Sequence, residues 1–488
     1  MVDKSNIQVT RIFDLLDRMK ELYDKPDALA GKENGKWKKY STGEYIRQAE
    51  LFSYGLLEMG FSKGDKIATI SNNRPEWNIV DMGMLQIGAV HVPVYQTIRD
   101  EEAKYILSHC DATMLIVSDA ELYEKMHPVV WETENIKDTF TFDPIDNVRN
   151  WKEITDLGKK TEEKHKKALQ HLKISISHND LASLVYTSGT TGTPKGVMLT
   201  HKNLITNAMT GAKRQKMDHR HRALSFLPLC HVYERMGIYE YQYLGISIYY
   251  AESMQTIAQD MRELKVHGFN TVPRLLEKVY DRIISKGKEL SWIKKQIFFW
   301  AVKLGQRFKL GKLNLCYRIK LRIARKLVFN KWKAALGGNI IFIGCGGAAL
   351  QLRLEKIFRA AGLPIQVGYG LTESSPLITT NMNSYPGVRF GSVGIPIDGV
   401  EVKIANDGEI LCRGHNVMKG YYKDEKRTQN VISEDSWLHT GDIGVIEDGG
   451  FLKITDRKKE IFKTSGGKYI APQVVENKFK ESIFIEQI

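Results

Sequence analysis

Short apolar runs alternate with longer amphipathic stretches over the first 120 residues. The spacing of apolar residues predicts strands at Lys66–Ser71 and Thr113–Val117, and helices at Pro75–Ile87 and Asp100–His109. Short strands separated by helices predict a parallel, doubly wound sheet. Residues 150–175 are rich in Lys and Glu, which indicates a solvated helical connection.

A second α/β pattern begins at about Leu181, and an antiparallel pattern of period two begins at Gly391, as in Val400–Ile404 and Glu409–Arg413. The predicted fold class is therefore α/β: two doubly wound subdomains and a small antiparallel β-barrel, followed by an incomplete small α+β domain. The expected boundaries are 1–180 and 181–390 for the α/β subdomains, 391–455 for the barrel, and 456–488 for a hinge and the start of the last domain.

The most informative stretch runs from Tyr186 to Gly196 and alternates hydroxyl residues with glycines. Glycines allow backbone N–H groups to approach a ligand closely, hydroxyls donate to phosphate oxygens, and Lys195 adds a positive charge. The spacing does not fit a Walker A loop, because Gly196 rather than Ser or Thr follows Lys195. Apolar runs on both sides predict a turn between two strands. The alternative is a flexible surface loop. The candidate phosphate-binding residues are Thr187, Ser188, Gly189, Thr190, Thr191, Gly192 and Lys195.

This stretch is similar to the phosphate-binding signature of the acyl-adenylate-forming enzymes, which include acyl-CoA synthetases, peptide-synthetase adenylation domains and beetle luciferases. The resemblance implies that ATP is a substrate and Mg²⁺ a cofactor. In the implied reaction a carboxylate attacks the α-phosphate of ATP and pyrophosphate leaves, and a thiol then attacks the acyl group and displaces AMP. It implies that Thr187 also contributes to the metal site.

Two later motifs extend the resemblance. Gly368-Tyr-Gly-Leu-Thr-Glu373 resembles the second nucleotide motif, in which Tyr369 stacks on adenine, Thr372 contacts the α-phosphate and Glu373 binds Mg²⁺; Gly370 belongs to the same turn. Trp437-Leu-His-Thr-Gly-Asp442 resembles the ribose motif, with Arg457 contacting nucleotide. Between them, Gly346 and Gly347 follow a predicted strand, Asn339–Ile343, and are expected at the same sheet edge.

His231 follows an apolar run, where a histidine is ordinarily a core residue. The resemblance implies instead that His231 orients the acyl carboxylate. Glu234 and Arg235 are interpreted as a structural ion pair.

Residues 436–459 are similar to the signature of fatty-acyl-CoA synthetases, which implies a long-chain fatty acid as substrate and coenzyme A as the acyl acceptor. Lys459 falls at the hinge of this family. Lys463 and the loop Gly466, Gly467, Lys468 resemble the segment that serves thioester formation. The family's adenylating lysine is expected beyond residue 488, so the sequence is expected to be truncated and to adenylate poorly. Two alternatives remain: a fatty acyl-AMP ligase that delivers to a carrier protein, and a lipid-responsive protein with a degenerate nucleotide site.

The net charge of +14 is concentrated in one segment. Residues 286–333 contain 15 Lys or Arg and one acidic residue, which leaves 56 basic and 56 acidic residues in the rest of the chain. Interspersed Trp, Phe and Ile indicate amphipathic helices that dock on an anionic membrane surface. The alternatives are a solvated helical hairpin and a nucleic-acid surface; no nucleic-acid motif accompanies the charge, so nucleic acid is not expected as a partner.

The remaining features of the sequence concern the cellular location of the protein. Five scattered cysteines suit a reducing compartment, no signal peptide is recognisable, and no apolar run is long enough to span a bilayer. A cytoplasmic protein, peripheral on the inner membrane face, is therefore expected.

Overall fold

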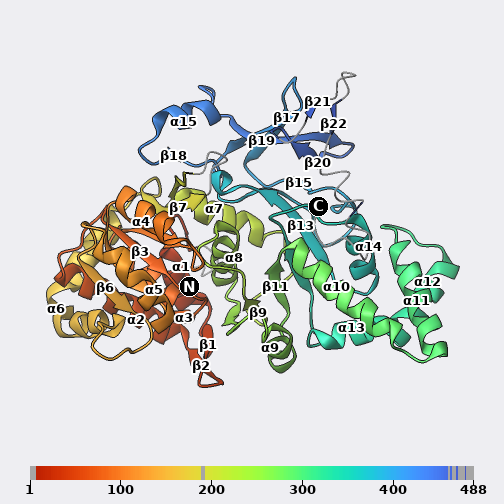
Figure 1. Cartoon of the computed structure of the whole chain (residues 1–488), viewed down its shortest axis with the longest axis horizontal. Helices are drawn as coiled ribbons and strands as arrows, with labels where there is room; N and C mark the ends of the chain where they lie inside the picture. The colour runs from red at the N-terminus through yellow and green to blue at the C-terminus, as the bar shows by residue number, and fades with distance from the viewer. Residues whose placement is uncertain (1–6, 188–192, 460–461, 464–468, 471–478, 480–488) are drawn as a thin grey trace.

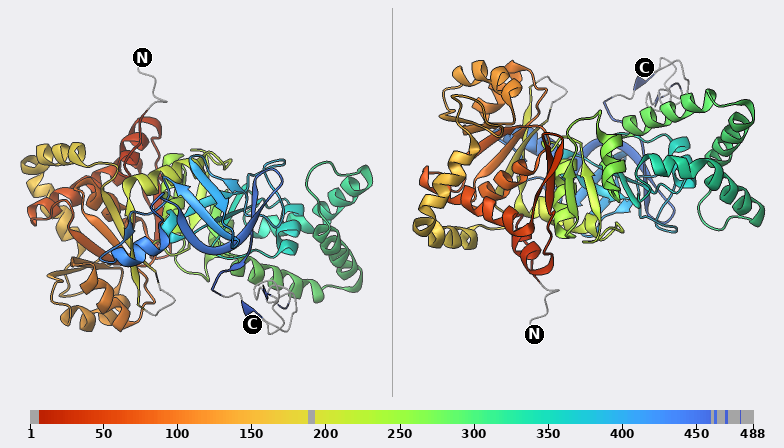
Figure 2. Two further views of the ribbon diagram at one scale, coloured as in Figure 1. Left: turned by 90° about the horizontal axis from the view of Figure 1, so that it is seen from above. Right: turned by 90° about the horizontal axis from the view of Figure 1, so that it is seen from below.

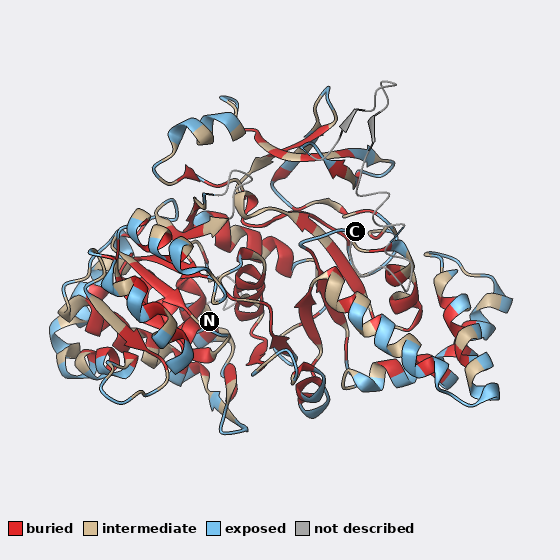
Figure 3. Cartoon of the chain, viewed as in Figure 1, coloured by how far each residue is buried: buried red, intermediate tan, exposed pale blue. Residues whose placement is uncertain are grey.

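The computed structural model of the 488-residue chain describes residues 7–187, 193–459, 462–463, 469–470 and 479. Two large sheets lie side by side, and a smaller antiparallel sheet lies above them in the view of Figure 1. Buried residues concentrate on the strands of both large sheets and on the helices between them (Figure 3).

The first sheet has the order β18-β8-β7-β4-β3-β5-β6. The strands from β7 to β6 pair in parallel, whereas β7, β8 and β18 pair antiparallel. The strands are β3 (Lys66–Ile70), β4 (Val90–Val94), β5 (Ala112–Val117), β6 (Asp138–Thr141), β7 (Leu181–Thr187), β8 (Lys195–Thr200) and β18 (Gly420–Tyr421). The accompanying helices are α1 (Asp14–Leu22), α2 (Thr42–Glu58), α3 (Pro75–Gln86), α4 (Asp100–His109), α5 (Ala120–Trp131) and α6 (Trp151–Ser175).

The second sheet has the order β15-β14-β13-β12-β11-β9-β10-β1-β2, parallel from β13 to β1 and antiparallel at both edges. Its strands are β1 (Leu29–Glu33), β2 (Lys36–Tyr40), β9 (Arg222–Ser225), β10 (Ser247–Tyr250), β11 (Gly268–Thr271), β12 (Phe342–Cys345), β13 (Ile365–Gly370), β14 (Leu377–Thr380) and β15 (Ile395–Pro396). The helices of this region are α7 (His201–Ala212), α8 (Val232–Tyr243), α9 (Ile257–Leu264), α14 (Leu352–Ala360) and the single turn η3 (Thr372–Ser374).

The α/β class is confirmed, but the sheets do not follow the expected boundaries. Strands β7 and β8 lie beyond residue 180 and yet complete the first sheet, while β1 and β2 lie before it and complete the second. Both sheets are mixed rather than wholly parallel. At the edge of the second sheet, β2 follows β1 through a two-residue turn, Asn34-Gly35, and pairs antiparallel with it.

The expected barrel is an open, four-stranded antiparallel sheet with the order β16-β17-β19-β20, which amounts to half a barrel. Its strands are β16 (Val400–Ile404), β17 (Glu409–Gly414), β19 (Leu438–Glu447) and β20 (Phe451–Arg457), and α15 (Glu425–Val431) lies between β18 and β19 in the chain. The described part of the last segment contains one strand pair, β21 (Phe462–Lys463) with β22 (Tyr469–Ile470).

The basic segment is helical, as expected. It comprises the end of α10 (Pro273–Lys288), α11 (Trp292–Gln306), α12 (Leu315–Ala324), the π-helical turn η2 (Arg325–Phe329) and α13 (Asn330–Ala335). Helices α11 and α12 project at the end of the molecule farthest from the first sheet (Figures 1 and 2). Among the described residues, no helix is both long and apolar enough to cross a bilayer.

Candidate active site

The predicted phosphate loop joins two paired strands, as its flanking apolar runs indicated. Strands β7 and β8 are antiparallel neighbours, and Thr187 at the end of β7 lies opposite Lys195 at the start of β8. The backbone therefore returns on itself across the loop and brings these two residues to the same end of the hairpin. Ser188, Gly189, Thr190, Thr191 and Gly192 lie outside the described residues.

Tyr421 joins this hairpin to the second motif. Because β18 pairs with β8, Tyr421 lies opposite Val197, and its ring centroid is 4.9 Å from Nζ of Lys195. The Tyr421 hydroxyl donates to Oε1 of Glu373 at 2.8 Å, and the Met418 N–H donates to the carbonyl oxygen of Glu373 at 2.9 Å. The structure thus brings Lys195 to the ring and Glu373 to the hydroxyl of the same tyrosine, a relationship that the sequence did not reveal.

The second motif forms a turn at the end of β13. A Cβ at Gly370 would lie 1.7 Å from the carbonyl oxygen of Pro376, so only glycine fits this close approach of backbones. Gly368 pairs with Thr380 on β14, and η3 begins at Thr372, which is half-buried. The turn therefore presents Thr372 and Glu373 at the edge where β13 ends.

Asp442 is held by two other predicted site residues. Its Oδ2 accepts a hydrogen bond of 2.7 Å from the Tyr369 hydroxyl, and its Oδ1 accepts one of 3.2 Å from Nε of Arg457. Arg457 lies directly opposite Asp442 in the β19–β20 pairing. Asp442 is 6% exposed, and burial together with the carboxylate raises the pKa of Tyr369, so the phenol remains a donor. A carboxylate offers about four acceptor positions, which leaves capacity for a diol.

His231 precedes the first turn of α8 and is not a core residue. Its ring lies 5.3 Å from that of Tyr95, which follows β4 of the first sheet. Although the residue is exposed to solvent, partial enclosure of its side chain by the protein lowers the pKa of His231 and favours the neutral imidazole.

The predicted site glycines Gly346 and Gly347 follow strand β12. The backbone of Gly347 has a φ of +82°, a conformation that favours glycine.

A buried network fixes helix α8. Nη2 of Arg235 and Nδ1 of His91 each lie 2.6 Å from Oδ1 of Asp81, and the Tyr239 hydroxyl donates to Oδ2 at 2.6 Å. Burial alone would raise the pKa of Asp81, but the Arg235 guanidinium and His91 lower it overall. The network links α8 to α3 and β4 and so fixes the orientation of the helix that follows His231.

The expected pair between Glu234 and Arg235 does not form. Consecutive helical residues point in different directions, and Glu234 instead accepts a 2.6 Å hydrogen bond from the Ser225 hydroxyl. Burial raises the pKa of Glu234 to about 7.

A cavity lies between α8 and strands β11 to β14. Gly368 of the second motif and Tyr233 near His231 both line it, so it extends from the candidate site. The rest of its wall combines apolar residues and glycines with polar side chains. The apolar and glycine part includes Met236, Phe342, Gly344 and Leu377, and the polar part includes Asn270, Gln366 and Thr380. Glu240 also lines the cavity, and burial raises the pKa of this carboxyl to about 8.

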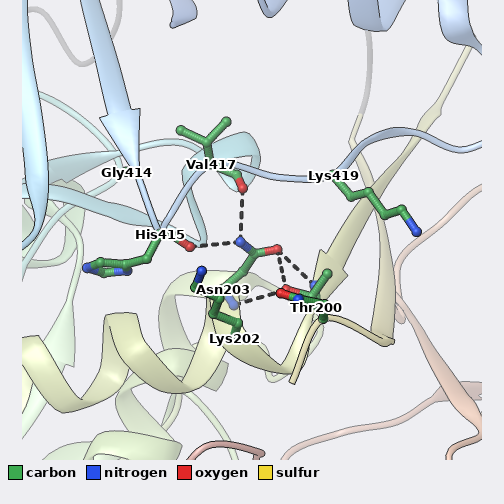
Figure 4. Close-up of a pocket in the computed structure, with 8 residues that line it drawn as sticks. Thr200, Lys202, Asn203, Gly414, His415, Val417 and Lys419 are labelled. Carbon is green, nitrogen blue, oxygen red and sulfur yellow. Dashed lines mark hydrogen bonds between the residues drawn. The ribbon is translucent and has the colours of Figure 1, made fainter. Parts of the chain in front are cut away.

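A second, open pocket lies at the opposite end of β8 and contains none of the predicted site residues (Figure 4). Thr200 caps α7 there, and Nδ2 of Asn203 donates to the carbonyl oxygens of His415 and Val417 at 2.8 and 2.9 Å (Figure 4). These bonds anchor the segment that leads into β18, and therefore help to place Tyr421.

The residues expected beyond the half-barrel are only partly described. Lys459 is exposed, and its neighbour Lys458 donates to Asp407 at 2.7 Å and Glu409 at 2.8 Å, which ties the expected hinge to β17. The backbone of Lys463 pairs with Tyr469. Gly466, Gly467 and Lys468 lie outside the described residues.

Two mixed α/β sheets, a half-barrel, the Lys–Tyr–Glu group and the Tyr–Asp–Arg group together define an acyl-adenylate-forming ligase. The chain belongs to the AMP-binding enzyme family, whose profile matches residues 20–422.

Similar curated proteins cover most of the chain. The long-chain-fatty-acid–CoA ligase FadD15 of Mycobacterium tuberculosis is 32% identical over 464 residues, which are 93% of this chain and 75% of that protein. The long-chain-fatty-acid–CoA ligase ACSBG2 of Xenopus laevis is 30% identical over 99% of this chain and 67% of its own length.

Solved structures share the fold. An anthranilate–CoA ligase in complex with anthranoyl-AMP matches 100% of this chain and 85% of its own, with a TM-score of 0.75 at 18% identity. A fatty acyl-CoA synthetase of Mycobacterium tuberculosis matches 99% and 85%, with a TM-score of 0.68 at 19% identity.

Proposed function

We propose that this protein activates long-chain fatty acids with ATP, forming acyl-AMP and pyrophosphate, and then transfers the acyl group to coenzyme A. The observation that carries the proposal is the position of Tyr421 between Lys195 and Glu373, because it gathers a phosphate-binding cation and a metal-binding carboxylate beside one hairpin. The names of the curated relatives, which are CoA ligases, favour coenzyme A over a carrier protein as the acceptor.

The nucleotide and the fatty acid each have a suitable environment. Asp442 accepts the ribose hydroxyls, Lys195 and the adjoining loop bind the phosphates, and neutral His231 orients the carboxylate without adding charge. The acyl chain enters beside α8 through the cavity that Gly368 lines; the cavity measures about 40 Å³ and widens to admit a long chain. Burying methylene groups stabilises the complex by roughly 0.8 kcal/mol each, which favours a long chain over a short one.

The reaction requires one anion to attack another. A carboxylate oxygen bonds to the α-phosphorus as the bond to pyrophosphate breaks, and the thiol sulfur of coenzyme A later bonds to the acyl carbon as AMP leaves. The contribution of Lys195 and His231 is mainly positioning and charge stabilisation.

Mg²⁺ fits the residues present. The described residues contain no cluster of three His, Cys, Asp or Glu side chains that could form an all-protein metal cage. Glu373 and the Thr187 hydroxyl would supply oxygen ligands, the type that Mg²⁺ prefers. When bound, the ion screens repulsion between the carboxylate and the triphosphate.

Calorimetry with nonhydrolysable acyl-sulfamoyl adenosines tests the proposal. The palmitoyl compound is expected to bind at least about 100-fold more tightly than the acetyl compound, because it buries more methylene groups. Asp442→Asn should weaken both compounds, whereas Lys419→Ala, in the second pocket, should weaken neither. Absence of binding by both compounds would reject adenylate recognition, and equal binding would reject long-chain selectivity. Supplying preformed palmitoyl-AMP with either coenzyme A or an acyl carrier protein then identifies the acceptor by its thioester product.

A further inference from the structure

Helix α11 carries two apolar faces. Phe298, Ala301, Val302 and Gly305 are buried, and α14 packs against this helix. On the other side, four large apolar side chains are exposed: Trp292 (75%), Ile293 (65%), Ile297 (37%) and Trp300 (37%). At about 100° per residue, the centres of the two faces are roughly 150° apart. One apolar face is sufficient to attach a helix to a domain, and the second face is left exposed by the rest of the described residues.

Helix α12 repeats the arrangement and η2 continues it. Leu321, Ala324 and Val328 are buried, whereas an exposed apolar residue recurs every fourth position. An α-helix drifts by about 40° in four residues. The hydrogen bonds of η2 span five residues rather than four, so this turn rotates less per residue. Leu327 therefore stays on the same side as the exposed apolar residues of α12, and these residues together are here called a stripe, as are the exposed apolar residues of α11. The exposed residues are Leu315 (70%), Ile319 (50%), Ile323 (46%) and Leu327 (45%).

Exposed apolar area is concentrated here. Of the nineteen large apolar residues that are exposed in the described chain, nine lie between Leu290 and Leu327. Because contiguous exposed apolar patches mark interaction sites, this concentration predicts a partner.

Positive charge surrounds both stripes. None of the basic side chains interspersed with them pairs with a carboxylate among the described residues, and Glu289 is the one acidic residue between positions 286 and 333. The exposed basic residues that flank the stripes are Lys294, Lys303, Arg318, Lys320, Arg322 and Lys326. These basic side chains are therefore available to a partner of negative charge.

We propose that α11, α12 and η2, here named the arm (residues 292–329), dock on the surface of an anionic lipid bilayer. A bilayer provides both features that the arm requires: anionic headgroups for the basic residues and an acyl boundary for Trp, Ile and Leu. A nucleic acid would match the charge but offers no comparable apolar layer. The arm projects at one end of the molecule, which leaves its outer side accessible (Figures 1 and 2).

Co-sedimentation of the chain with vesicles tests the proposal. Binding is expected to vesicles of phosphatidylcholine with about 30% phosphatidylglycerol, to be weak on phosphatidylcholine alone, and to fall as salt rises from about 0.1 M to 1 M. Substituting three stripe residues with serine should weaken binding at least about tenfold, because their apolar area no longer enters the lipid. The apolar variant is Ile319→Ser/Ile323→Ser/Leu327→Ser, and its matched control is Trp131→Ser/Ile174→Ser, which alters exposed apolar residues elsewhere.

A charge series separates the two contributions. Neutralising three arm residues should also weaken binding about tenfold or more and flatten its salt dependence. The arm variant is Arg318→Gln/Lys320→Gln/Arg322→Gln, and the charge-matched control on α6 is Lys159→Gln/Lys160→Gln/Lys167→Gln. Vesicle binding that is unchanged by both arm variants would overturn the proposal. Arm-dependent self-association in sedimentation, without vesicle binding, would also overturn it and assign the surface to a second copy of the chain.

Discussion

The hydroxyl of Tyr421 donates a 2.8 Å hydrogen bond to Oε1 of Glu373, while the ring of the same residue lies 4.9 Å from Nζ of Lys195. Burial and the Glu373 carboxylate raise the pKa of Tyr421, so the phenol stays protonated and remains a donor. One oxygen of Glu373 is therefore fixed by a hydrogen bond from the protein.

Tyr421→Phe should weaken the Mg²⁺-dependent part of nucleotide binding about tenfold, because a hydrogen bond to a charged group contributes roughly 1.5–3 kcal/mol. The ring beside Lys195 remains in this variant, so binding without Mg²⁺ should change little. Calorimetry with a nonhydrolysable ATP analogue, with and without Mg²⁺, measures both quantities. Tyr422→Phe is the control, since the Tyr422 hydroxyl donates to exposed Asp111 instead. Equal loss with and without Mg²⁺ would contradict a role through Glu373.

Asp442→Asn should remove discrimination between ATP and its 2′,3′-dideoxy analogue. The wild-type carboxylate accepts hydrogen bonds from a diol, so it should bind the ribose form at least about tenfold more tightly. The ratio of the two dissociation constants is the measured quantity, because it cancels losses that affect both nucleotides equally. Asp448→Asn, an exposed change on the same half-barrel, should leave the ratio at its wild-type value. A wild-type ratio near one would contradict the ribose assignment.

The sequence predicted the local features of the site because each depends on neighbouring residues. The turn around Gly370 and the hairpin before Lys195 follow from backbone requirements that the residue types express directly. Tyr421 could not be found in this way, because it reaches Glu373 only through the pairing of β18 with β8. No local signal marks a two-residue strand that pairs across the fold.

The boundary at residue 180 failed for the same reason. Each apolar run was interpreted with its sequence neighbours, but β7 and β8 pair into the first sheet while β1 and β2 pair into the second. The separation of Glu234 from Arg235 also required the direction of each side chain on α8 and its partners on other elements.

Glu240→Gln should stabilise the protein at alkaline pH. The folded pKa is about 8, against an ordinary value of 4.5, so the unfolded chain releases this proton first and stability falls as pH rises from about 4.5 to 8. Glutamine keeps the shape without this titration. The free energy of unfolding should therefore exceed that of the wild type by on the order of 2–4 kcal/mol at pH 8, and by little at pH 4.5.

Urea titrations at the two pH values measure this difference. Glu163→Gln, an exposed change on α6, is the control and should not depend on pH in the same way. An advantage of Glu240→Gln that is the same at both pH values would show that shape or polarity, rather than proton release, accounts for it.

His201 should weaken the fold at acidic pH. Its side chain is fully buried, Nδ1 accepts from the Ile12 N–H at 3.3 Å, and Nε2 has no partner among the described residues. Burial lowers its pKa from 6.5 to about 4. The unfolded chain therefore binds this proton first, and the free energy of unfolding should fall by about 3 kcal/mol as pH decreases from 6.5 to 4.

His201→Asn retains an acceptor near the position of Nδ1 but cannot be protonated in this range, so the corresponding part of the pH dependence should disappear. The slope of unfolding free energy against pH is the relevant quantity, because the smaller side chain lowers stability at every pH. His171→Asn, an exposed change on α6, should keep the wild-type slope. If His201→Asn also showed the wild-type slope of unfolding free energy against pH, the acid sensitivity would have to arise from another buried group. The contact between helix α7 and the segment at Ile12 would then not depend on pH.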